Sequence, residues 1–259
     1  MNKEVKETKA NEVVEVSDID SFLGERAGAG TENYTQDDLA LPFLKTLSRQ
    51  DAALDDLAGA KAGDIYNNAT LEVYSGDEGL LVVPCHYEKV YIQWAPRGTG
   101  TGAPVNIFKT QDACPPSERN EKDNTDYIID GEGSYLETTA QHYVLIVGEN
   151  GTTSPALMSM KSTQLKKSRT WNTLITTAAP IQTATGPKPA PSYAHYYRVS
   201  TVAEENAKGS WTGWKIVRGD KVNVLDHLVA ADAMAESFEK GEVKVKHTQE
   251  ADPQTDVPF

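Results

Sequence analysis

Alternation of apolar and polar side chains is the dominant pattern of the chain, and it predicts a protein built mainly of β-strands. The alternation is clearest in residues 86–94, where His86, Val90, Ile92 and Trp94 fall on one face and Tyr87, Lys89, Tyr91 and Gln93 on the other. Asn150 and Gly151 separate two apolar segments, which predicts a tight hairpin. Further strands are predicted over residues 65–74, 79–84, 135–147, 156–160, 193–202 and 211–218.

Helical spacing replaces the alternation in three segments. A short helix is predicted to start at the acidic cap Asp37-Asp38 and to run through Leu47. A second covers residues 161–178, with its apolar side chains on one arc and Lys166 and Arg169 on the opposite side. A third covers residues 224–238. The sequence therefore predicts a mainly β protein with a few helices, one of them basic.

These elements are expected to form one folded domain over residues 37–240. Several strands joined by long loops favour an open Greek-key barrel of the oligonucleotide-binding (OB) type, with the basic helix inserted and a C-terminal helix added. A β-sandwich is the alternative. The flanking segments, residues 1–36 and 241–259, are polar and acidic, and we expect them to be disordered.

Charge is distributed unevenly along the chain. The 259 residues carry a net charge of −13, which at first argues against a nucleic-acid partner. Residues 160–218, however, contain nine bases and only two acids, whereas the segments on both sides are acidic. Because a polyanion responds to the local field, the segregated charge leaves nucleic-acid binding open.

Composition indicates an intracellular protein. The two cysteines are too few for a disulfide framework, the charged first residues do not resemble a signal peptide, and no apolar run is long enough to span a membrane. We therefore expect a cytoplasmic protein without membrane contact.

Aromatic side chains are interleaved with the bases of residues 160–218. Single-stranded nucleic acid needs both groups, because cations neutralise phosphates and rings stack on unpaired bases at about 1–3 kcal/mol per base. Taken singly, each ring is more often part of a core. Strand alternation assigns Tyr197 and Trp214 to the core, and it pairs Tyr196 with Arg198 and Trp211 with Lys215 on a binding face. The predicted DNA contacts are Lys161, Lys166, Lys167, Arg169, Tyr196, Arg198, Trp211 and Lys215, extended by Tyr87, Lys89, Tyr91 and Arg97.

The chain ends in Asp256, Val257, Pro258 and Phe259, an acidic and apolar tip suited to docking in a pocket of another protein. This tip resembles the C-terminal tip of bacterial single-stranded DNA-binding proteins. Residues 41–45, 63–67, 82–87 and 160–172 resemble stretches of bacteriophage single-stranded DNA-binding proteins. The tip is less acidic than is usual for that family and lacks a long Gly/Gln-rich linker.

The resemblance implies an OB fold that coats single-stranded DNA without sequence preference during phage replication, recombination or repair. A phage-encoded protein of this kind is expected in the host cell cytoplasm. It also implies that the tip recruits replication or recombination proteins. A homo-oligomer is compatible with this interpretation.

Other chemistries have less support in the sequence. Residues 97–102 are glycine-rich but lack the ending of a phosphate-binding loop. Cys85, His86, Cys114 and His142 could supply zinc ligands, but without the paired spacing of known sites. We therefore expect neither an enzyme nor a cofactor or metal. The alternatives are a strand-annealing recombination mediator, a metal-dependent enzyme acting on nucleic acid, and a virion or scaffolding protein.

Overall fold

The computed structural model describes residues 16–34, 41–100, 102–206 and 209–240. The chain divides into two units, Met1–Leu39 and Ala40–Phe259. The first unit contains helix α1 (Val16–Glu25), which lies in a segment expected to have no regular structure. The predicted cap Asp37-Asp38 and the tip at residues 256–259 lie outside the described residues.

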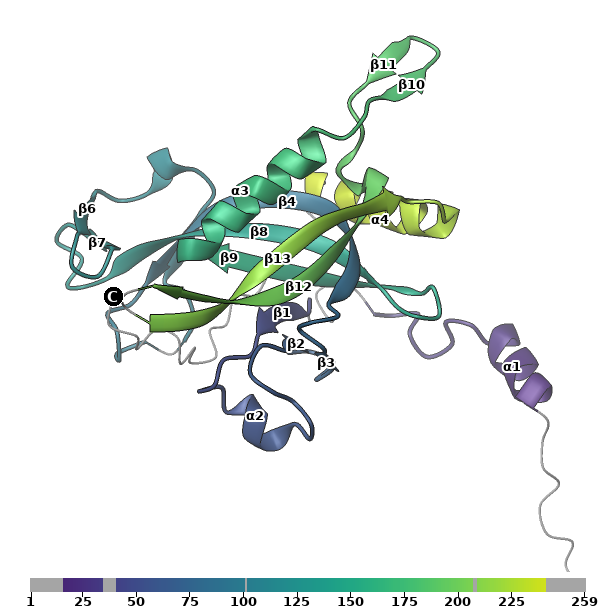
Figure 1. The fold of residues 1–259 in the computed structure, drawn as a ribbon, viewed down its shortest axis with the longest axis horizontal. Helices are drawn as coiled ribbons and strands as arrows, with labels where there is room; N and C mark the ends of the chain where they lie inside the picture. The colour runs from purple at the N-terminus through teal and green to yellow at the C-terminus, as the bar shows by residue number, and fades with distance from the viewer. Residues whose placement is uncertain (1–15, 35–40, 101, 207–208, 241–259) are drawn as a thin grey trace, which may run out of the picture. The chain divides into compact units, whose positions relative to one another are not determined.

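A single large sheet forms the body of the second unit (Figure 1). Its strands follow the order β13-β12-β4-β8-β9-β1-β2-β3, and its pairs are antiparallel except for β1 with β9. Short strands β5 (Asn106–Phe108), β6 (Ser117–Asn120) and β7 (Thr125–Ile128) extend it beside β4 and β8. The main strands are β1 (Phe43–Thr46), β2 (Ile65–Asn67), β3 (Val73–Tyr74), β4 (Leu80–Trp94), β8 (Tyr135–Val147), β9 (Thr153–Lys161), β12 (His195–Asn206) and β13 (Gly209–Lys221).

The sheet curls into a half-barrel because of how its strands are connected. Strands β3 and β4 are five positions apart in the sheet, which in a flat sheet is about 24 Å. Only residues 75–79 connect them, and this connection reaches at most about 21 Å. Thr201 of β12 closes the curl, donating its backbone N–H to Gly76 O and its hydroxyl to Gly63 O. The fold is therefore mainly β, as predicted, and compatible with an OB-like barrel.

Strand β4 contains a β-bulge at Cys85. Pro84 pairs with Val144 and His86 with Tyr143, so Cys85 is an extra residue opposite two consecutive partners. The two strands expected at 79–84 and 86–94 are thus one strand, and the bulge exchanges the faces that odd and even residues occupy. Beyond the bulge, Tyr87 pairs with His142, and the predicted alternation of residues 86–94 is confirmed.

Helices α3 (Leu165–Thr176) and α4 (Leu225–Glu239) cover opposite faces of the sheet. On one face, Trp171 of α3 packs among Val82, Val144 and Tyr197. On the other, Ala231 of α4 packs on Val83 and Leu145. Helix α3 falls within its predicted range, α4 differs from its predicted range by one residue at each end, and the 3-10 turn η3 (Ser162–Gln164) leads into α3. The remaining short helices are α2 (Ala53–Asp56), η2 (Gln111–Ala113) and η4 (Ser192–Ala194), and a hairpin of β10 (Ile181–Thr183) and β11 (Gly186–Lys188) follows α3.

The helix predicted through Leu47 is wrong, because residues 43–46 form strand β1. Leu44 pairs with Met158 of β9 on one side and with Asn67 of β2 on the other. A short apolar run is compatible with either element, and here the tertiary pairing decides. The strand predicted at 65–74 is likewise two strands, separated by a turn in which Leu71 has a φ of 60°.

Candidate nucleic-acid interface

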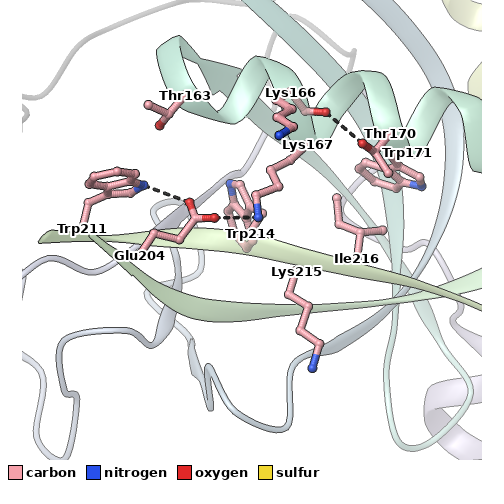
Figure 2. A pocket seen from close by; sticks show the side chains of 10 residues that line it. All are labelled: Thr163, Lys166, Lys167, Thr170, Trp171, Glu204, Trp211, Trp214, Lys215 and Ile216. Atoms are coloured by element: carbon pink, nitrogen blue, oxygen red, sulfur yellow. Dashed lines mark hydrogen bonds and ion pairs between the residues drawn. The ribbon is translucent and has the colours of Figure 1, made fainter. Parts of the chain in front are cut away.

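A groove of about 440 Å³ lies between helix α3 and the strands β12 and β13 (Figure 2). We name it the α3–β13 groove. The helix supplies its basic wall and the strands supply tryptophans and one acid. Its lining residues are Thr163, Lys166, Lys167, Thr170, Trp171, Glu204, Trp211, Trp214, Lys215 and Ile216.

Helix α3 presents a basic face beside this groove. Its apolar arc is fixed by Trp171, which is fully buried, and this leaves Lys166 and Arg169 exposed. The helix contains no acid, and neither base forms an ion pair with any residue in the described part of the chain. The two side chains are three residues apart and therefore lie close together on the helix surface. This spacing suits neighbouring phosphates.

Glu204 joins the two walls of the groove. Its carboxylate lies 2.6 Å from Lys167 Nζ and accepts the indole N–H of Trp211 at 3.0 Å. Burial alone would raise the pKa of this carboxyl, but the hydrogen bonds from Lys167 and Trp211 outweigh it and lower the pKa. Glu204 is therefore anionic at neutral pH, and it holds both predicted DNA contacts.

Two of the four tryptophans meet in the core beneath the groove. Trp171 is 0% exposed and Trp214 is 4% exposed, and both pack with Tyr197. The assignment of Tyr197 and Trp214 to the core is confirmed. Trp211 is half-buried, so in this groove it is the tryptophan that can offer a ring to a base.

A stack of rings runs from the core to the surface on the other flank of α3. The Trp171 ring stacks on His142 with centroids 4.3 Å apart, and His142 lies 5.0 Å from the Tyr87 ring. Tyr87 is 40% exposed. Lys89 lies over the Tyr91 ring at 5.4 Å, although Tyr91 itself is buried. Tyr87 and Lys89 thus lie on the face of the sheet that α3 covers, beside the helix, and extend the candidate interface.

The buried His142 is neutral. Burial lowers the pKa of its imidazole to about 3, and Nε2 lies 2.8 Å from the hydroxyl of Ser168 in α3. The ring therefore positions the helix on the sheet rather than contributing charge to the interface.

The other predicted contacts lie elsewhere. The prediction that Tyr196 contacts DNA is wrong. Its side chain is 8% exposed beneath α4, and its hydroxyl lies 2.8 Å from His227 Nδ1, so its ring is not accessible to a base. Lys215 points away from α3, on the opposite side from Trp211, so these two do not form the predicted pair (Figure 2). The pairing of β12 with β13 is regular here, and the strong twist of a two-stranded ribbon turns alternate side chains several residues apart toward different sides.

Arg198 lies on the same side of the sheet as α4, where its guanidinium donates to Gly79 O at 3.4 Å. Lys161 lies 3.5 Å from Glu137 in an ion pair, and Arg97 lies over the Tyr135 ring at 5.7 Å. The structure therefore brings together Lys166, Lys167, Arg169 and Trp211, with Tyr87 and Lys89 on the far flank of the helix.

Sequence reasoning missed Glu204, Gln164 and the small side chains Thr163 and Thr170. The threonines carried no signal. Glu204 did, because Glu204 and its neighbour Glu205 are the two acids among the nine bases of residues 160–218, although the sequence does not show which of them has a basic partner.

The candidate zinc ligands do not converge. Cys85 lies in the cluster under α4, whereas His142 faces α3 across the sheet. Among the described residues, no group of three His, Cys, Asp or Glu side chains could hold a metal ion. Within the same residues, no helix is both long and apolar enough to cross a membrane.

The family of the chain follows from its sequence as a whole. Residues 9–244 match the model of a phage protein family, the Pam3 phage gp34-like protein. The match covers most of the chain, and the chain therefore belongs to this family. No curated protein and no solved structure matches it.

Proposed function

We propose that this phage protein binds single-stranded DNA along helix α3 and the α3–β13 groove, without sequence preference and without catalysis. The observation that carries the proposal is the acid-free basic face of α3, which lies next to the half-buried ring of Trp211 in an otherwise acidic protein. Replication, recombination or repair of phage DNA is the process that we propose for it, and a Greek-key OB barrel is the topology that we propose.

Two physical terms would supply the affinity. Lys166, Arg169 and Lys89 would neutralise phosphates and release counterions, which makes binding weaken as salt rises, with a slope of about −0.7 per phosphate neutralised. Stacking on Trp211, and on Tyr87 at the other flank, would add about 1–3 kcal/mol per base. Neither term reads base identity, so the binding is expected to tolerate any sequence.

A titration with oligo-dT tests the proposal. Binding should quench tryptophan fluorescence, and the affinity should fall steeply between low and high salt. Trp211→Ala should weaken binding about tenfold or more, because one stacking contact is lost. Lys166→Gln/Arg169→Gln should weaken binding and flatten the salt slope by about 1.4.

A matched control removes the same charge elsewhere. Lys61 and Lys122 are exposed bases outside the candidate interface, and the double variant Lys61→Gln/Lys122→Gln should bind nearly as well as the unaltered protein. Absence of any salt-dependent binding by the unaltered protein would exclude the proposed function. Equal losses in both double variants would exclude the assignment to α3.

For the C-terminal tip we propose a second role, recruitment of a replication or recombination protein. The pattern of Asp256, Val257, Pro258 and Phe259 supports it, since an acid beside an aromatic end group suits a basic-rimmed apolar pocket. Deletion of the last nine residues should leave DNA binding intact or slightly tighter and abolish capture of a protein partner. Retention of every partner by the shortened protein would contradict this role.

A further inference from the structure

The carboxylate of Glu204 occupies a niche with the donors of an anion site. Lys167 Nζ lies 2.6 Å from Oε1, and the Trp211 indole donates to Oε2 at 3.0 Å. The side chain of Gln164 donates a further hydrogen bond. Its own amide oxygen accepts the backbone N–H of Trp214, which turns the NH₂ group toward the carboxylate. Donors from α3, from the turn before it and from β13 thus converge on one anion.

Gly213 provides the space for this anion. A Cβ at this position would clash with Glu204 Oε2 and would lie 3.2 Å from Gln164 Nε2. The backbone of Gly213 has no left-handed φ, so glycine is needed here for room rather than for conformation. The niche therefore exists because a side chain is missing, and the carboxylate fills that volume.

The same three donors are suited to a phosphate oxygen. An ammonium group, an indole N–H and an amide NH₂ only donate, and charged acceptors make the strongest hydrogen bonds with such groups. Lys166, which forms no ion pair with a described residue, lines the same groove. A strand that follows the basic face of α3 would thus pass the niche.

We infer that this niche is a phosphate site of the nucleic-acid interface and that Glu204 occupies it until a bound strand displaces the carboxylate. This inference rests on the proposed function. The exchange replaces one anion with another, so Lys167 and Trp211 keep an acceptor in both states. Glu204 lies two residues before the end of β12, and its side chain is 24% exposed, so it can turn into solvent.

Removing the competing charge tests the inference. Glu204→Gln should bind oligo-dT about three- to tenfold more tightly than the unaltered protein, because no carboxylate then has to be displaced. The salt slope should stay about the same, since Lys167 meets one phosphate in both complexes. The matched control is Glu205→Gln, which removes the same charge from the adjacent, exposed residue. It should change affinity much less.

A double variant identifies the cation. In Glu204→Gln/Lys167→Gln the gain should disappear. A second measurement follows the Trp211 indole N–H by ¹⁵N NMR in the unaltered protein: its resonance should move on addition of oligo-dT and stay unchanged with the unphosphorylated nucleoside thymidine.

The outcomes separate the two ideas. If the unaltered protein does not bind oligo-dT, the proposed function fails and the niche has no strand to hold. If it binds, but Glu204→Gln is no tighter than Glu205→Gln, the inference alone is overturned. Weaker binding by Glu204→Gln would assign Glu204 the opposite role, that of positioning Trp211 for the strand.

Discussion

At the scale of single residues, His142 shows how burial decides what a side chain can do. Its ring lies between Trp171 and Tyr87, bonded to Ser168, and only 1% of it is exposed. Among the described residues, no acid contributes to the pKa of this imidazole, and burial alone disfavours its protonated form. Its environment holds its pKa at about 3, far below the value of about 6.5 in an unfolded chain.

This difference predicts that acid destabilises the fold. The unfolded chain takes up a proton at His142 below about pH 6.5, whereas the folded protein does not until about pH 3, so stability is present above pH 6.5 and is lost as the pH falls. Between pH 7 and pH 5 the free energy of unfolding should fall by about 2 kcal/mol from this residue. Urea titrations at several pH values measure it.

The control is His142→Gln, which keeps a hydrogen-bonding group but does not titrate. Burial also lowers the pKa of His86 and His195, so the unaltered protein has contributions from three histidines. The pH dependence of His142→Gln should be shallower than that of the unaltered protein. Identical dependence in the two proteins would show that His142 is not the group responsible.

At the scale of elements, Trp171 is the largest buried side chain by which α3 packs on the sheet. Trp171 is fully buried and contacts rings from β8 and β12, whereas the bases of the same helix lie at the surface. The packing of Trp171 in the core therefore sets the position of the basic side chains at the surface.

Trp171→Ala should cost about 3–5 kcal/mol of unfolding free energy, because it leaves a large cavity under α3. The same truncation at the half-buried Trp211 should cost about 1 kcal/mol, mainly its hydrogen bond to Glu204. Urea denaturation of both variants makes the comparison. Similar losses would mean that α3 does not depend on Trp171.

The elements that the sequence predicted best are those with long, regular patterns. Helices α3 and α4, strand β8 and the hairpin at Asn150-Gly151 all lie where periodicity and turn residues place them. Strand β1 could not be distinguished from a helix, because its four residues depend on partners more than a hundred residues away in β9. Local pattern carries no information on such pairing.

The candidate site was predicted only in part, because it too depends on contacts between residues far apart in the sequence. The bases of α3 follow from helical spacing alone. Tyr196 was predicted to be exposed to DNA, but it is buried. The element that covers it is α4, which is separate from its own strand. The groove needs three elements at once, and neither Glu204 nor Gly213 has meaning for it until β12, β13 and α3 are brought together.

At the scale of the whole molecule, the contacts of the chain separate an acidic first unit from the unit that carries the candidate interface. Residues 1–40 carry four bases and ten acids, and the contacts of the chain separate Met1–Leu39 from Ala40–Phe259. The sheet, both covering helices and the candidate interface all belong to the second unit.

Removal of residues 1–39 should therefore leave the melting temperature of the remaining protein within a few degrees of the full chain. Oligo-dT affinity should stay equal or rise modestly at low salt, because six net negative charges are removed from a protein that binds a polyanion. Calorimetry and the oligo-dT titration measure the two effects. A large drop in melting temperature would show that the first unit stabilises the sheet.

The bulge at Cys85 has a consequence for reading related chains. Before it, even-numbered residues of β4 face α3; after it, odd-numbered residues do, and this places Tyr87 and Lys89 beside the helix. A relative that lacks one residue between positions 82 and 87 would present the tyrosine and lysine on the α4 side, even with every other letter identical. In this family, an alignment gap at that point therefore changes the candidate interface more than a substitution does, because the number of residues in the strand decides on which face of the sheet the aromatic and basic side chains lie.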